Sequence, residues 1–146
     1  MNKEEIKAVH IRLDAGRENT ILSILLAADG SVNRMGNGRL SNTDKDLYIG
    51  AGQEQLFRDF ISRIPDDLLG YAGRYDLPEP RGLPCKLTLL FAGQDESGAG
   101  FEFRYGSESQ GPPAEIQQLL IAAVEITDGW LQAQQSRTQK RWWKPW

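Results

Sequence analysis

Apolar and polar residues alternate along the first part of the chain at the spacing of β-strands. In residues 6–14, Val9, Ile11 and Leu13 share one face, while polar or small residues share the other, which predicts a half-buried strand. The apolar run that follows is apolar on both sides and predicts a more deeply buried strand. We expect strands over residues 6–14, 21–28 and 31–35, and a short additional edge strand over residues 47–50.

The spacing changes to that of an α-helix in two places. Residues 53–64 place five large apolar side chains on one stripe before Pro65 stops the helix. A longer helix begins near Pro112 or Pro113, and its apolar stripe continues to Leu131. Beyond Leu131 the sequence is polar, so a helix there would be solvated or covered by something else.

Between the two helices, residues 85–91 and 101–105 alternate again and predict a second hairpin. Hairpin strands interrupted by two helices favour an α+β fold, a single-domain two-layer sandwich. We expect an antiparallel sheet of about five strands, in the order β-β-β-α-β-β-α, with both helices on one face. The expected domain covers residues 1–136, and residues 137–146 form a C-terminal tail.

Composition supports a single domain and argues against several classes of protein. The 146 residues are 40% hydrophobic and 25% charged, which suits one globular domain. A net charge of −3 argues against nucleic-acid binding. The longest apolar run, residues 24–28, is far shorter than the roughly 20 residues of a membrane span. The charged N-terminus lacks the apolar region of a secretion signal, and the single Cys85 points to a reducing compartment, so we expect a cytoplasmic protein.

Few residues offer catalytic chemistry. His10 is the only histidine, and no nucleophile is identifiable beside it in the sequence. Cys85 lies on the apolar face of its strand, where a core role is the simpler explanation. Gly50 and Gly52 precede a helix, so backbone N–H groups there could bind an anion weakly, although a turn before the helix explains them as well. We predict no catalytic residue, no metal site and no cofactor.

The segment 66–84 is a better candidate for a functional surface. It is long for a connection in a small domain, and such segments often bind partners. Tyr71, Arg74, Tyr75 and Arg81 are of the residue types enriched at interface hot spots. The alternative is that the four leucines of this segment simply pack it over the end of the sheet.

The last ten residues differ from the rest in charge and aromatic content. Residues 137–146 hold four of the 17 basic residues and none of the 20 acidic ones, so the tail carries +4 and the rest of the chain −7. Arg141, Trp142, Trp143 and Trp146 are candidate partner-binding residues, because each tryptophan can bury a large area. Two alternatives stay open, namely weak association with an anionic membrane surface and folding back onto the acidic domain.

These observations favour a non-catalytic protein-interaction module. One concrete form is an inhibitor or immunity-type protein that masks a partner, because that role needs a compact acidic domain and no catalytic residue. The alternative is a small-ligand-binding protein or an enzyme with a pocket near residues 50–52 and the 66–84 segment. In that case Tyr71, Arg74 and Asp76 would supply the polar groups.

Overall fold

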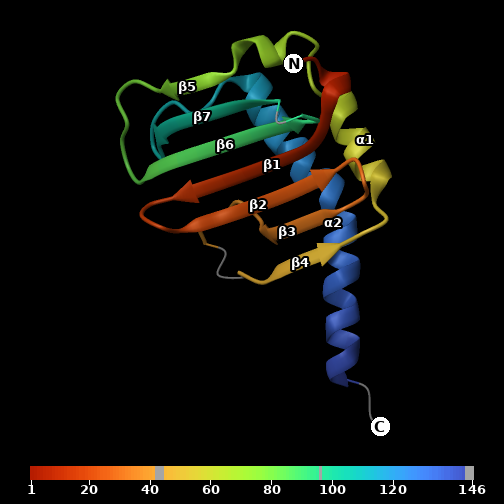
Figure 1. The fold of residues 1–146 in the computed structure, drawn as a ribbon. Helices are drawn as coiled ribbons and strands as arrows, with labels where there is room; N and C mark the ends of the chain where they lie inside the picture. The colour runs from red at the N-terminus through yellow and green to blue at the C-terminus, as the bar shows by residue number, and fades with distance from the viewer. Residues whose placement is uncertain (42–44, 96, 144–146) are drawn as a thin grey trace.

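The computed structural model describes residues 1–41, 45–95 and 97–143, of which 138–143 are described by their helical backbone alone. One seven-stranded sheet and two α-helices form the domain (Figure 1). The strands are β1 (Ile6–Ala15), β2 (Thr20–Ala27), β3 (Val32–Gly36), β4 (Leu47–Gly50), β5 (Gly73–Asp76), β6 (Pro84–Gly93) and β7 (Gly98–Gly106). The helices are α1 (Glu54–Ser62) and α2 (Ala114–Trp143), with short 3-10 helices at η1 (Lys3–Glu5) and η2 (Leu68–Tyr71).

The order of strands across the sheet is β4-β3-β2-β1-β6-β7-β5. Neighbouring strands are antiparallel except for β5, which runs parallel to β7. The mixed α+β fold with two helices is therefore confirmed. The sheet differs in detail from the prediction, because it has seven strands rather than about five and one of its strand pairs is parallel. The strand that the sequence pattern missed is β5, in which all four residues are exposed, so no alternation of apolar residues marks it.

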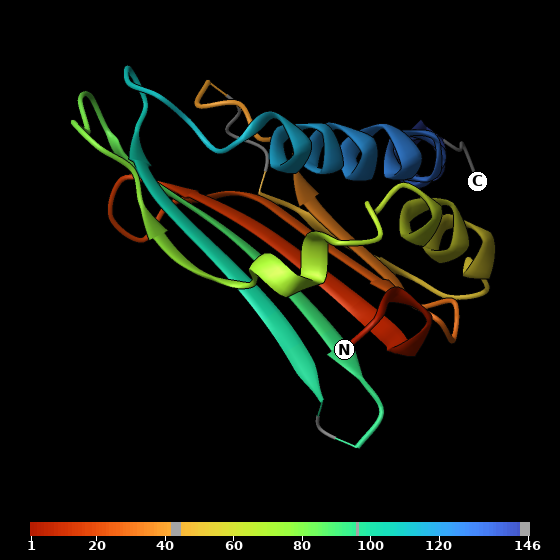
Figure 2. The same cartoon turned by 90° about the horizontal axis from the view of Figure 1, so that it is seen from above.

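Both α-helices cover the same face of the sheet (Figure 2). The core lies between them and the inner sheet face, where Ile11, Leu22 and Leu89 are completely buried. Phe60 of α1 and Ala123 of α2 close it from the helical side, also with no exposed surface. The opposite face of the sheet carries no helix, so its side chains line the outer surface of the domain (Figure 2).

A buried arginine attaches α2 to the sheet. Arg34 of β3 lies on the inner face, and its side chain is only 1% exposed. Its Nη1 donates hydrogen bonds to Asp128 Oδ1 at 2.8 Å and to Thr127 Oγ1 at 2.9 Å, and its Nε donates to the carbonyl of Gly36 at 2.9 Å. A guanidinium can be buried at this point because these acceptors replace water.

Helix α2 continues well past the sheet. The last core contacts of α2 near β4 come from Trp130. Its ring packs so closely on Gly50 that a Cβ added to Gly50 would lie 2.5 Å from Trp130 Cζ2. Beyond that point α2 leaves the sheet at the β4 edge and projects away from the domain (Figure 1). Its thirty residues span about 45 Å, because each helical residue rises about 1.5 Å.

Candidate functional site

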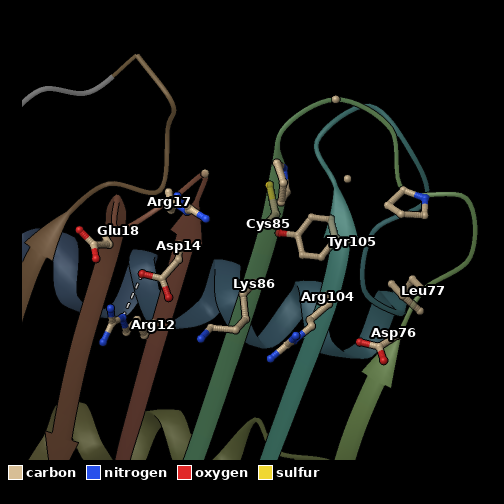
Figure 3. Close-up of a pocket in the computed structure, with 15 residues that line it drawn as sticks. Arg12, Asp14, Arg17, Glu18, Asp76, Leu77, Cys85, Lys86, Arg104 and Tyr105 are labelled. Atoms are coloured by element: carbon tan, nitrogen blue, oxygen red, sulfur yellow. Dashed lines mark hydrogen bonds and ion pairs between the residues drawn. The ribbon is translucent and has the colours of Figure 1, made fainter.

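An open groove lies at the end of the sheet where β1 ends and β6 begins. Strand register sets one row of charged residues on the outer face, because Asp14 pairs with Lys86, Lys86 with Arg104, and Arg104 with Asp76. Residues directly opposite each other on neighbouring strands project from the same face of a sheet. Figure 3 shows Lys86 and Arg104 side by side on neighbouring strands, between Asp14 and Asp76.

The groove encloses about 790 Å³ and has mixed charge. Its basic lining residues are Arg12, Arg17, Lys86 and Arg104, and its acidic ones are Asp14, Glu18 and Asp76. Four cations against three carboxylates leave the groove slightly positive, although the whole chain carries −3.

The acidic groups near this groove are largely engaged. Asp14 Oδ1 accepts hydrogen bonds from Arg12 Nε at 3.0 Å and from the Thr20 hydroxyl at 2.6 Å. Arg104 Nε donates to Glu102 Oε2 at 3.1 Å. Within the described residues, the half-buried Lys86 ammonium has neither an ion-pair nor a hydrogen-bond partner. The groove therefore offers two cations, the half-buried Lys86 and the exposed Arg17, for which no ion pair is found within the described residues.

Tyr105 and Cys85 form one wall of the groove as uncharged side chains. Burial raises the pKa of Tyr105 to about 12, with a smaller contribution from the neighbouring Cys85. Burial also raises the pKa of the Cys85 thiol, which donates weakly to the carbonyl of Leu83 at 3.6 Å. A protonated thiol is a poor nucleophile, in keeping with the core role predicted for it.

A second hollow, of about 390 Å³, opens between the 65–77 segment, β7 and the start of α2. It is an aromatic pocket. The rings of Tyr75 and Phe103 stack with centroids 5.1 Å apart and planes at 11°, and Phe101 stacks on Phe103 at 6.3 Å. The other lining residues are Pro65, Asp67, Leu68, Tyr71, Leu77, Pro113, Glu115 and Ile116.

The charge at the mouth of this aromatic pocket has one sign. Asp67 and Glu115 are the only ionised lining groups, and among the described residues none that lines it is cationic. Tyr71 is 64% exposed, and the Tyr75 hydroxyl donates a hydrogen bond to its carbonyl oxygen. The pocket thus combines an apolar floor with an acidic rim.

The four residues predicted from the 66–84 segment do not form one site. Tyr71 and Tyr75 both line the aromatic pocket. Arg74 forms ion pairs with Glu102 at 3.4 Å and with Asp76 at 3.7 Å. These side chains lie on the outer face of the sheet. Arg81 lies in the loop before β6, where its N–H donates to Ser109 Oγ at 3.3 Å and its carbonyl accepts from the Glu108 N–H. Along the chain, the segment forms the 3-10 helix η2, then strand β5 and then a loop. Its side chains lie on both faces of the sheet.

The glycines before α1 lie at the other edge of the sheet. Gly50 belongs to β4 and packs against Trp130, whereas Gly52, at φ +73°, has open space around it. The Gln53 N–H, at the start of α1, already donates to the Gly30 carbonyl at 2.9 Å. Strands β4 and β5 are the two outermost strands, and residues 50–52 line neither the groove nor the aromatic pocket.

The predicted tail begins inside α2. Arg141, Trp142 and Trp143 belong to the last turns of this helix, and their side chains are not described. Trp146 lies outside the described residues. The proposed boundary at residue 136 therefore falls within a continuous helix rather than at a change of structure.

The structure adds a neighbour to His10 that the sequence did not reveal. Its Nε2 lies 3.2 Å from Ser23 Oγ. Ser23 is on the adjoining strand β2, two residues from Leu25, which is the direct partner of His10. Burial, followed by the charge of Arg12, lowers the pKa of His10. Neither His10 nor Ser23 lines the groove or the aromatic pocket.

Two searches of the described residues gave no candidates. No group of three or more His, Cys, Asp or Glu side chains within them could hold a metal ion. None of their helices combines the length and apolar character needed to cross a lipid bilayer. In comparisons with known proteins, the chain matches no family model and no curated protein sequence.

Proposed function

We propose that this chain is a non-catalytic protein-interaction module that binds its partner at the β5 edge of the sheet. The aromatic pocket carries this proposal, because it places Tyr71 and Tyr75 beside stacked phenylalanines at an open strand edge. Tyrosine is among the residues that contribute most binding energy at interfaces. The pocket is also supported by rigid elements, since β5 pairs with β7 along its whole length.

The partner that fits this edge is an extended segment of another protein. As the outermost strand, β5 has backbone groups on one side that face no strand within the described chain, and such an edge can pair with an added strand. An apolar side chain of that segment would fill the pocket over Phe103 and Tyr75. A neighbouring lysine or arginine would then lie near Asp67 and Glu115, which gives the partner segment a basic and apolar character.

The role we favour for such a module is an inhibitor or immunity-type protein that masks its partner in the cytoplasm. The lowered pKa of His10 and the raised pKa of the buried Cys85 thiol support a role without catalysis by these two residues. The single cysteine is the support for a reducing location. The Trp-rich end of α2 stays a second candidate contact surface, at the opposite edge of the sheet.

Peptide display on the full-length chain tests the proposed edge. We expect selection from a random library to enrich segments with an aromatic or aliphatic residue next to lysine or arginine. Fluorescence polarisation with an enriched peptide should show a Kd about tenfold or more higher for Tyr71→Ala than for wild type. The reason is that truncating a hot-spot tyrosine costs at least about 1–2 kcal/mol of binding free energy. Leu47→Ala is the matched control, since Leu47 is 56% exposed on the opposite edge strand. No enrichment, or equal losses in the two variants, would contradict the proposal.

A further inference from the structure

The charged groove at the strand ends has no part in the proposed partner binding, although it has a volume of about 790 Å³. We infer that it is a binding site for a small molecule with an oxyanion group, a carboxylate or a phosphate, held between Lys86 and Arg104. This site is separate from the aromatic pocket, because its charged lining residues lie on the opposite face of β7 and β5.

Lys86 is the central observation. It is half-buried in the middle of a four-strand row, with Asp14 on one side and Arg104 on the other. No ion pair joins Lys86 to the neighbouring Asp14 within the described chain, and Asp14 Oδ1 accepts hydrogen bonds from Arg12 and Thr20 instead. A half-buried lysine without an ion pair favours an incoming anion more than a fully exposed surface lysine does, because its side chain is held in place and its charge is not neutralised.

Arg104 supplies the second half of the site. Its ion pair with Glu102 uses Nε, and within the described chain no contact of its two terminal nitrogens is found. Those two nitrogens present parallel N–H donors, the geometry that suits a carboxylate or a phosphate. Lys86 and Arg104 are direct partners across the β6–β7 ladder, so their cationic groups can hold one oxyanion from adjacent strands (Figure 3).

The remaining walls indicate what the rest of the ligand is. Leu77, Pro80 and Pro84 are apolar, and Tyr105 keeps its hydroxyl proton. The volume of about 790 Å³ lies within the range of about 300–1,000 Å³ found for small-molecule sites. Asp76 and Glu18 at the borders of the groove disfavour ligands with several negative charges. We therefore expect a ligand with one anionic group and an apolar or aromatic body.

The experiment is an NMR titration of the full-length chain at constant ionic strength. The probes are inorganic phosphate, acetate and phenyl phosphate, with sodium chloride as the reference. We expect saturable shifts at the backbone amides of Lys86 and Arg104 with phosphate or acetate, and tighter binding of phenyl phosphate because its ring contacts the apolar walls. Whether phosphate or acetate binds more tightly identifies which oxyanion the site prefers.

Paired variants make the result specific. Lys86→Gln should weaken phenyl phosphate binding about tenfold or more, because a hydrogen bond to a charged group contributes about 1.5–3 kcal/mol. Lys7→Gln is the matched control, since Lys7 is an exposed lysine of the central strand β1. Shifts spread over all surface lysines, or equal effects of the two variants, would overturn the site. Failure here leaves the peptide binding at the β5 edge untouched, because that measurement contains no anion probe.

Discussion

Replacing Asp128 by asparagine should destabilise the protein far more than its partly exposed position suggests. Asp128 neutralises the guanidinium of Arg34, which is 1% exposed, while the carboxylate itself is 42% exposed. Removing one partner of a buried ion pair costs about 3–5 kcal/mol, because the other charge is left without compensation. Water reaches the Asp128 side and reduces that penalty, so we expect a cost of about 2 kcal/mol for Asp128→Asn.

Replacing Arg34 by methionine should cost less, even though Arg34 is the buried member of the pair. The substitution removes the charge together with its desolvation penalty and leaves an apolar side chain of similar length, a change that is often close to neutral. Thr127 keeps its own hydrogen bond to the Ala123 carbonyl, at 2.7 Å, and Asp128 can be solvated. We expect a cost of about 1 kcal/mol or less for Arg34→Met, and nearly the same value for the double variant.

Urea unfolding followed by tryptophan fluorescence measures these values, because Trp130 lies against Gly50 in the folded chain. A loss of about 2 kcal/mol lowers the urea midpoint by roughly 1 M at the m-values of small proteins. Glu102→Gln is the control for an exposed pair, as the side chains of Arg104 and Glu102 are 47% and 28% exposed, and should cost less than about 1 kcal/mol. If the two single substitutions add within about 0.5 kcal/mol in the double variant, the pair is not coupled and the reasoning is wrong.

Four further outcomes follow from the described contacts. Gly50→Ala should cost about 1–3 kcal/mol, because the new Cβ would lie 2.5 Å from a Trp130 ring atom; a neutral result in urea unfolding would contradict this packing. Gly129→Ala, which meets no atom within 4 Å, should stabilise α2 by about 0.5–1 kcal/mol in the same assay. The lowered pKa of His10 means that the unfolded chain binds more protons, so wild type should lose stability relative to His10→Gln as pH falls below about 6.5. The Cys85 thiol should react with Ellman's reagent about tenfold or more slowly in the native state than in urea; equal rates would show an accessible thiol.

Period-two alternation was sufficient to predict the central strands from sequence. Every second residue is buried in β6 from Cys85 to Phe91, in β1 from Val9 to Leu13, and in β7 at Phe101 and Phe103. The stripe ending at Leu131 located the part of α2 that packs on the sheet. Strand β5 was not predicted because all four of its residues are exposed and show no apolar alternation. It forms through backbone pairing with β7. The buried role of Arg34 escaped for a related reason, since its acceptors at 127 and 128 are more than ninety residues away.

The candidate sites depend on strand order, which the sequence pattern did not determine. Tyr71 and Tyr75 were candidates by residue type, and both line the aromatic pocket. Asp14, Lys86 and Arg104 each appear in sequence as one polar position on an alternating strand. Only the adjacency of β1, β6 and β7 places them in one row, so the groove could not be inferred before the topology was known.

The short strand β5 gives the two hollows a common wall. Tyr75 lines the aromatic pocket and Asp76 lines the groove, while Leu77 contributes to both. A ligand that shifts this strand by filling one hollow therefore changes the shape of the other. Thermodynamic linkage makes any such effect reciprocal, so that if an anion alters the affinity for a partner segment by some factor, the segment alters the affinity for the anion by the same factor. Residues 75–77 are therefore the place where the two proposed binding events would be coupled.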